Sequence, residues 1–322
     1  MTQNPELSIV VPVYQSGQTL GRCMESILSQ SFRDFELIII NDGSRDNSAG
    51  IALEFARTDQ RVIVINRENG GLSAARNTGI SYARAPWITF IDSDDSIEQE
   101  TLKQNMGWLQ AHPETDLLEY PALLHHNGPA EKTLAFADQT VTADQMIADW
   151  VRRQGYRHCY AWNKIYRTSL FDTVRFPEGE NFEDAAIMPS IIRQCRTVRY
   201  SSKGLYLYTD TLNGITHRYT FHNQEPLFRH NMELFTLAFT ELSQADAAVL
   251  KRVAQNLLTD LCGCSDTIPD YIHGSAQKLD SMPVSLAAIF KADMSPKEKV
   301  KSIIYNMLGT ERACRLFSRK LS

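Results

Sequence analysis

The chain has 322 residues, of which 43% are hydrophobic and 22% are charged, which excludes a disordered chain and allows one large domain or two smaller ones. Lys and Arg number 33 against 38 Asp and Glu, and the resulting formal net charge of -5 argues against a general nucleic-acid-binding protein. The six cysteines form no C-x-x-C pair and no zinc-ligand spacing, so a reducing, cytoplasmic compartment is expected.

The first hundred residues alternate between short apolar runs and helical patterns. Runs rich in β-branched residues predict buried strands at residues 7–13, 35–40, 62–65 and 87–91. Helices are predicted between them at residues 20–28, 48–57 and 72–83. Because strands that alternate with helices form βαβ units, the predicted fold class is α/β, with a doubly wound, mostly parallel sheet.

After residue 99 the alternation loosens. Helices are predicted at residues 99–111, 142–154 and 182–193, and short strands at 116–120, 160–166 and 198–208. From residue 222 the pattern is helical, with helices expected at 225–242, 245–261 and 296–308. We therefore expect an α/β domain over residues 1–220 and a helical C-terminal region over residues 221–322.

Polar or turn residues directly follow three of the predicted strands. They are Tyr14-Gln-Ser-Gly17, Asn41-Asp-Gly-Ser44 and Asp92-Ser-Asp-Asp95. In open α/β sheets, ligands bind beyond the carboxyl ends of the strands, so these three turns predict one binding site.

The Asp92-Ser-Asp-Asp95 turn carries three carboxylates, which repel one another unless a cation lies among them. Mg²⁺ or Mn²⁺ suits such a site, because these ions use few protein carboxylates together with substrate phosphates. The alternative is an Asp-rich turn that caps the following helix through Asp94 or Ser96.

Two glycines precede the predicted helix in Asn69-Gly-Gly-Leu-Ser-Ala-Ala-Arg-Asn77. They allow a ligand to approach the backbone, and Arg76 is expected to face the end of the sheet. The segment is neither a dinucleotide fingerprint nor a P-loop, and the alternative is a turn that leads into a helix with a surface arginine. Asp42 offers a carboxylate for a nucleobase imide, or it simply belongs to a helix-entry turn.

The segments 7–14, 41–48, 69–77 and 90–95, taken in this order, together resemble a family-2 glycosyltransferase of the GT-A fold, of the type found in bacterial polysaccharide biosynthesis. The resemblance is close over about the first hundred residues, and it continues loosely to residue 220 through Trp162-Asn-Lys164 and Asn181-Phe-Glu-Asp184. Two departures are Gln15, where the family usually has Asn, and Asn41, where it often has Asp. Neither departure removes a residue that carries chemistry.

The resemblance implies a binding role for residues along the whole donor. The residues that match its nucleotide-binding positions are Pro12, Val13, Tyr14 (a stacking face for the base), Asp42 (a partner of a uracil-type base), Arg76, Asp92 and Ser93. Asp94 and His217 match ligands of a Mn²⁺ or Mg²⁺ ion, although a lone histidine is commonly structural. Trp162 and Lys164 are expected to border the donor sugar, and the alternative for Trp162 is a buried position at a sheet edge.

The resemblance also implies the chemistry. Asp184 matches the general base of inverting members, and its neighbour Glu183 is the competitor for that role. The alternative is that both acids merely favour the start of a helix. An inverting enzyme moves a hexosyl or N-acetylhexosaminyl group from a nucleotide-sugar, a UDP-sugar above all, to a glycan or lipid-linked acceptor.

Two other functions stay open at this stage. A sugar nucleotidyltransferase needs a basic, glycine-rich loop after the first strand, and Tyr14-Gln-Ser-Gly17 lacks a basic residue. A non-catalytic scaffold that binds a nucleotide-sugar predicts binding without turnover, and the presence of Asp92, Asp94 and Asp184 argues against it.

The C-terminal segment, residues 297–322, carries seven basic residues and two acidic ones. Apolar residues accompany them, which predicts a peripheral contact with an anionic membrane at the inner face of the cell membrane. A helix that packs on its own domain is the alternative. No stretch approaches the roughly 18 apolar residues of a membrane span.

Overall fold

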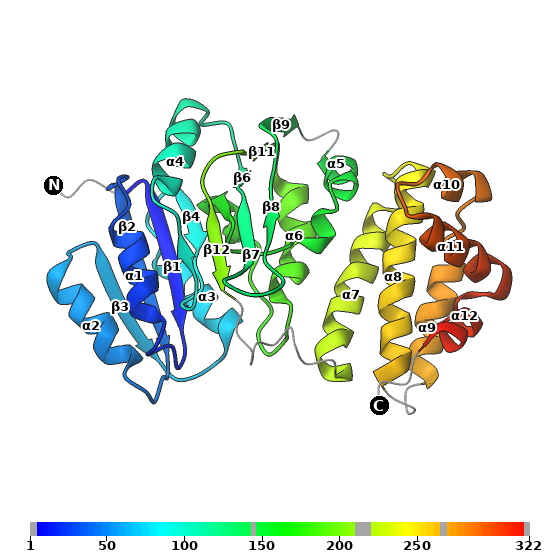
Figure 1. Ribbon diagram of the computed structural model, residues 1–322, viewed down its shortest axis with the longest axis horizontal. Helices are drawn as coiled ribbons and strands as arrows, with labels where there is room; N and C mark the ends of the chain where they lie inside the picture. Colours follow the sequence, from blue (N-terminus) through cyan, green and yellow to red (C-terminus); the bar gives the residue numbers. More distant parts are fainter. Residues whose placement is uncertain (1–4, 143–145, 210–219, 265–268, 319–322) are drawn as a thin grey trace. The chain divides into compact units, whose positions relative to one another are not determined.

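The computed structural model describes residues 5–142, 146–209, 220–264 and 269–318. Two compact units divide the chain (Figure 1). The first comprises residues 1–144 with 160–212, and the second comprises residues 145–159 with 213–322. The domain boundary expected at residue 220 stays a prediction, because residues 210–219 lie outside the described ranges.

An eight-stranded mixed sheet forms the centre of the first unit. Its order is β3 (Val62–Arg67), β2 (Phe35–Asp42), β1 (Leu7–Val13), β4 (Trp87–Phe90), β10 (Lys164–Arg167), β6 (Leu117–Glu119), β11 (Thr197–Tyr200) and β9 (Gln139–Thr142). The first four strands are parallel, and so are β6 and β11, whereas β10 is antiparallel to both its neighbours and β9 to β11. The predicted α/β class is confirmed, and the strands predicted in the first hundred residues are all present.

The central strand β1 is buried over all seven residues, because helices cover both of its faces. Leu7, Ile9 and Val11 belong to the same core cluster as the buried face of α1 (Leu20–Leu28). Side chains alternate along a strand, so Val10 points to the other face, where α3 (Leu72–Tyr82) lies. A Cβ on Gly79 of α3 would lie 2.2 Å from a methyl group of Val10, so the missing side chain lets α3 approach the sheet.

A small second sheet and three further helices complete this unit. The strands run in the order β5 (Ser96–Ile97), β12 (Tyr206–Thr209), β7 (Ala122–His126) and β8 (Lys132–Leu134). The helices are α2 (Ser48–Thr58), α4 (Thr101–Ala111) and α6 (Glu183–Gln194). The segment 198–208, expected to be extended, is divided between the two sheets, with Gly204 at a φ of 78° between β11 and β12.

The second unit is helical in its described part, as predicted for residues 221–322, although it also includes residues 145–159, which were expected in the α/β domain. Its helices are α5 (Met146–Arg152), α7 (Phe221–Ala238), α8 (Gln244–Cys264), α9 (Pro269–Asp280), α10 (Leu286–Lys291), α11 (Pro296–Leu308) and α12 (Thr310–Phe317). The start of α11 follows from its sequence: the Ser295 hydroxyl accepts a hydrogen bond from the Glu298 N–H, and Pro296 occupies the first helical position. None of the helices in the described ranges is long and apolar enough to cross a membrane.

Candidate functional site

The three polar turns after β1, β2 and β4 are hydrogen-bonded to one another, as the sequence predicts. The Ser16 hydroxyl lies 2.6 Å from that of Ser93, which joins the turns after β1 and β4. The Ser16 N–H donates to the Ser48 hydroxyl at 2.8 Å, which joins the turns after β1 and β2. Because the parallel register brings Val13 level with Asn41, the ends of β1 and β2 lie side by side.

The chain leaves the sheet at this edge after Val13, the last residue of β1. Pro12 and Val13 are buried in β1, whereas the Tyr14 side chain is 49% exposed and leaves an aromatic face open. Gln15 has a φ of 51°, in the left-handed region that Asn tolerates better than Gln. The departure from the family pattern at residue 15 therefore places a less suited residue in a constrained turn.

The buried Asp42 carboxylate organises the turn that precedes α3. It accepts hydrogen bonds from the N–H groups of Gly70 and Gly71, at 3.0 and 2.8 Å, and from the Asn69 side chain at 3.1 Å. Arg67 lies 3.3 Å from the same carboxylate. Asp42 thus fixes the glycine turn, a role that the sequence did not predict, and its contact with a nucleobase stays a prediction.

The carboxylates of Asp92, Asp94 and Asp95 gather after β4, as predicted. Burial and the neighbouring Asp92 raise the pKa of Asp94 to about 6. Burial, together with Asp94 and Asp92, raises the pKa of Asp95 well above its ordinary value. The raised pKa values indicate that neighbouring positive side chains do not balance the negative charge of the three carboxylates at this turn.

Strand β12 holds the Asp95 carboxylate. Its carboxylate accepts hydrogen bonds from the Tyr206 hydroxyl at 2.8 Å and from the Thr209 N–H at 2.7 Å. The Tyr206 hydroxyl in turn accepts a hydrogen bond from the Asp92 N–H at 3.1 Å. Strand β12 therefore fixes the acidic turn, and no local sequence pattern indicated that Tyr206 would do so.

Arg22, on α1, is a second residue that sequence reasoning missed. Its guanidinium donates to the backbone carbonyl of Asp94 at 2.6 Å and to the Thr209 hydroxyl at 3.1 Å. It lies next to the acidic turn and lowers the pKa of Asp94 against the effect of burial. Arg22 is not among the buried residues of α1, and no local sequence pattern distinguished it from other exposed arginines.

Arg76 joins the acidic turn to the start of α6. Its guanidinium is 2% exposed and donates to the Asp92 carboxylate at 2.8 Å and to the Glu183 carboxylate. It also lies over the ring of Phe176, 5.3 Å from the ring centroid. Burial alone would lower the pKa of Arg76, but Asp92, Glu183 and Asp184 together raise it. Arg76 therefore stays charged and holds both carboxylates, rather than being a surface arginine.

Glu183 and Asp184 are the first two residues of α6, directly after Phe182, which has a φ of 60°. Glu183 is buried against Arg76, whereas Asp184 is partly exposed. Burial and the adjacent Glu183 raise the pKa of Asp184 to about 7, although Arg76 opposes this effect. Asp184 can therefore exchange a proton near neutral pH.

The side chains around Asp94 offer a partial set of ligands for the predicted Mn²⁺ or Mg²⁺ ion. Among the described residues, no three His, Cys, Asp or Glu side chains converge into a ready-made metal cage. The raised pKa of Asp94 beside Asp92 nevertheless marks the negative charge that a divalent cation would neutralise. Such a donor set fits an ion that takes most of its other ligands from phosphate and water. His217 lies outside the described residues.

Trp162 and Lys164 lie inside the first unit. The Trp162 ring is buried and stacks with Tyr206, with the ring centroids 4.3 Å apart. The Lys164 side chain is 1% exposed and its ammonium lies 3.0 Å from the buried Glu119 carboxylate. These contacts serve the packing of β10, and the predicted contact with a donor sugar stays a prediction.

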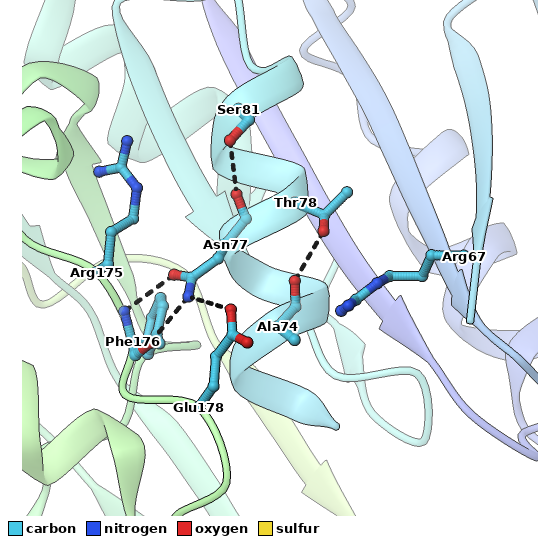
Figure 2. A pocket seen from close by; sticks show the side chains of 8 residues that line it. All are labelled: Arg67, Ala74, Asn77, Thr78, Ser81, Arg175, Phe176 and Glu178. Atoms are coloured by element: carbon cyan, nitrogen blue, oxygen red, sulfur yellow. Dashed lines mark hydrogen bonds between the residues drawn. The ribbon is translucent and has the colours of Figure 1, made fainter. Parts of the chain in front are cut away.

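A shallow pocket of about 480 Å³ lies beside this site, on the outer face of α3 (Figure 2). Asn77 of α3 holds its wall, because the Asn77 side chain donates to the Phe176 carbonyl at 2.9 Å and accepts from the Phe176 N–H at 3.0 Å. Arg67 reaches the pocket from β3 and Arg175 from the opposite side. Asp92, Glu183 and Asp184 do not line this pocket, but its Phe176 ring is the one that lies against the Arg76 guanidinium.

Known proteins match this chain in sequence. A family model described as "Glycosyl transferase family 2" matches residues 8–120. The chain is 36% identical to EpsH of Bacillus subtilis, over 72% of this chain and 68% of EpsH. It is 31% identical to the glycosyltransferase GlyG of Streptococcus pneumoniae, over 79% of this chain and 87% of GlyG. A match to the glycosyltransferase GlyA of the same species, at 31% identity, spans only 31% of GlyA.

Two solved structures share the fold. TarS of S. aureus (residues 1–349), in complex with UDP-GlcNAc, has a TM-score of 0.70 at 19% identity, over 97% of this chain and 91% of TarS. The mannosyltransferase PcManGT from Pyrobaculum calidifontis, in complex with GDP-Man and Mn²⁺, has a TM-score of 0.55 at 13% identity, over 95% of this chain and 88% of that one. At these identities the likeness establishes the architecture alone, and it agrees with the predicted fold.

Proposed function

This chain belongs to glycosyl transferase family 2, and from that premise we propose an inverting, metal-dependent transfer of a sugar from a UDP-sugar to an acceptor hydroxyl. The sugar is a hexosyl or N-acetylhexosaminyl group. The observation that carries the proposal is the arrangement of Asp92, Arg76 and Glu183, which links the acidic turn to the start of α6. Asp184, the residue that we assign as the base, directly follows Glu183 there.

The donor's nucleotide is proposed to lie over the turns after β1 and β2. The exposed Tyr14 ring offers a stacking face for the base, and Asp42 shapes the glycine turn against which the base rests. Asp92 and Ser93 are assigned to the ribose side of the donor. The complex of TarS with UDP-GlcNAc supports a UDP-sugar as the donor class, because TarS has the same fold.

A divalent cation is assigned to Asp94, next to the diphosphate. When bound, Mn²⁺ or Mg²⁺ supplies Lewis-acid stabilisation of the charge on the leaving nucleotide. The chain's own contribution is to hold the turn: Tyr206 fixes Asp95 and the Asp92 N–H, and Arg22 holds the Asp94 carbonyl. The Mn²⁺ in the complex of PcManGT supports the choice of metal.

Asp184 is assigned as the general base. Glu183 is engaged by Arg76, so its carboxylate is the less available of the two. With a pKa near 7, Asp184 is substantially deprotonated at neutral pH and can accept the proton of an attacking hydroxyl. Attack from the side opposite the leaving nucleotide inverts the anomeric centre, so an α-linked donor gives a β-linked product.

The acceptor is proposed to be a glycan or a lipid-linked glycan in cell-surface polysaccharide biosynthesis, reached from the cytoplasmic face of the membrane. The basic segment 297–322 is proposed to contact anionic lipid there. This assignment rests on family membership and on the character of the C-terminal helices.

A donor screen tests the proposal. UDP-, GDP- and dTDP-sugars are incubated with Mn²⁺ or Mg²⁺, and release of the nucleoside diphosphate is measured for the wild type and for Asp94→Ala. We expect release from one UDP-sugar that requires the metal and is lost in the variant. Binding of a nucleotide without turnover, in the presence of lipid-linked acceptors as well, would favour a non-catalytic scaffold, and absence of nucleotide binding would contradict the proposal.

A further inference from the structure

Exposed apolar side chains gather on the last three helices of the second unit. Of nine large hydrophobic side chains that are exposed in the described part of the chain, six lie on α10, α11 and α12. These six are Leu286, Phe290, Val300, Met307, Leu308 and Leu316. Three of them are the most exposed, at 78% for Met307 and 64% for both Phe290 and Leu316. Single exposed apolar residues need no explanation, but a group on adjoining helices marks a surface that binds something.

The apolar stripe of α11 points outward. Val300, Ile303, Ile304 and Met307 follow the spacing i, i+3, i+4 and i+7, so they lie on one face of the helix. All four are exposed or partly exposed. The buried side of α11 instead carries Ser302 and Tyr305. A helix that only packs on its own domain would show the reverse arrangement, with the stripe turned inward.

The three helices adjoin one another within the unit (Figure 1, orange to red). The Lys299 ammonium on α11 donates to the backbone carbonyl of Phe290 on α10 at 2.8 Å. The Lys301 ammonium lies 5.6 Å from the ring centroid of Phe317 on α12, and Tyr305 stacks on the same ring. The exposed apolar residues therefore lie on a layer of three helices in which α11 contacts both α10 and α12.

The same layer is basic. Residues 286–318 carry six Lys or Arg residues against three acidic ones, in a chain whose net charge is -5. Two of the acids are neutralised within the unit: Glu298 accepts a hydrogen bond from Arg252 at 2.6 Å, and Glu311 accepts from Arg315 at 2.9 Å. Lys291, Lys297 and Arg312 remain exposed beside the apolar side chains.

We propose that α10–α12 form a monolayer-binding surface that lies flat on an anionic lipid bilayer, with Phe290, Val300 and Met307 inserted among the acyl chains and the basic residues at the headgroups. This proposal rests on the membrane contact proposed above for residues 297–322. It adds α10 to the contacting surface. It also assigns the contact to the three folded helices and not to the basic segment alone. Apolar burial and attraction to anionic lipid add together in such surfaces. The inference does not depend on which sugar is transferred.

A second copy of the chain fits this surface less well. A symmetric dimer through the layer would bring two basic surfaces together, and like charges across an interface oppose association. An anionic bilayer complements both the charge and the apolar stripe.

Vesicle flotation of the full chain tests the surface. The wild type is mixed with vesicles of phosphatidylcholine alone, or with about 30% phosphatidylglycerol, at about 100 and about 500 mM NaCl. We expect flotation with the anionic vesicles that weakens at the higher salt. The double variant Val300→Gln/Met307→Gln should bind about tenfold more weakly or worse, because two inserted apolar side chains are lost.

The matched control is Leu53→Gln/Tyr82→Gln, which removes two exposed apolar side chains from the first unit and should float like the wild type. Circular dichroism of each variant checks folding. Release of UDP without vesicles, measured in parallel, should be equal in all three proteins, so failure of lipid binding and failure of the glycosyltransferase proposal are distinguishable. The proposal is overturned by a wild type that does not float, by equal flotation of the double variant, or by a dimer in sedimentation velocity that the double variant loses.

Discussion

The guanidinium of Arg76, on α3, donates a hydrogen bond to the carboxylate of Glu183, the first residue of α6, across 107 positions of sequence. The same guanidinium donates to Asp92 after β4. One buried cation therefore fixes the distance between the acidic turn, assigned to the donor diphosphate, and Asp184, assigned as the base. We regard this arrangement as the frame of the active site.

Replacement of Arg76 by Met is expected to lower the free energy of unfolding by about 3–5 kcal/mol, because two carboxylates lose a buried partner. Arg196→Met is the control: Arg196 lies 3.8 Å from Asp116 but is 81% exposed, so its loss should change stability by less than about 1 kcal/mol. Urea unfolding measures both. Equal stability of the two variants would contradict a structural role for Arg76.

Much of the fold around this site could be predicted from the sequence, but the ion pairs of Arg76 with Asp92 and Glu183 could not. The β-branched runs predicted β1 to β4, because strands buried on both faces need continuous apolar residues. Strands β5, β7 and β8 have two to five residues and no strong period, so they were not predicted. One signal for Arg76 was available: with Ser73 and Ile80 it follows i, i+3 and i+7 spacing, which puts it on the buried face of α3.

The hydrogen bonds of Tyr206 lay beyond sequence reasoning, because they join two elements 114 residues apart. Tyr206→Phe removes the hydroxyl that donates to one oxygen of Asp95 and accepts from the Asp92 N–H, so this N–H and that carboxylate oxygen each lose a partner. We expect the free energy of unfolding to fall by about 1–3 kcal/mol and the KM for the donor to rise. Tyr82→Phe, at an exposed tyrosine, should change neither. A wild-type KM in Tyr206→Phe would show that the acidic turn holds its shape without β12.

Tyr14→Ala tests the stacking face. The side chain is 49% exposed, so its removal should hardly affect stability, while nucleotide affinity should fall about tenfold with the loss of a base–aromatic contact. Calorimetric titration with UDP in the presence of Mn²⁺ measures the change. Tyr82→Ala, 50% exposed on α3, is the matched control, and an equal Kd for both variants would remove Tyr14 from the site.

The pH dependence follows from Asp184. Burial and Glu183 raise its pKa to about 7, and only the deprotonated carboxylate can accept a proton. Activity should therefore be about half of its plateau near pH 7 and level above about pH 8, and below pH 7 it should fall by up to about tenfold per pH unit, so that about pH 5 gives roughly a hundredth of the plateau. The rate is measured at saturating donor with the metal concentration fixed. A rate that stays level down to about pH 5 would mean that the base has an ordinary carboxyl pKa.

The most direct test compares Asp184→Asn with Glu183→Gln, using the donor that the screen identifies. The account predicts that Asp184→Asn keeps the wild-type Kd for UDP but loses about 10³-fold in turnover, because the proton acceptor is removed. Its stability at neutral pH should equal or exceed that of the wild type, because a charged carboxylate with a raised pKa is replaced by a neutral amide. Glu183→Gln should lose stability, through its weakened pairing with Arg76, and retain more turnover than Asp184→Asn. The reverse order of turnover, with Glu183→Gln the more severe, would make Glu183 the base and contradict the account.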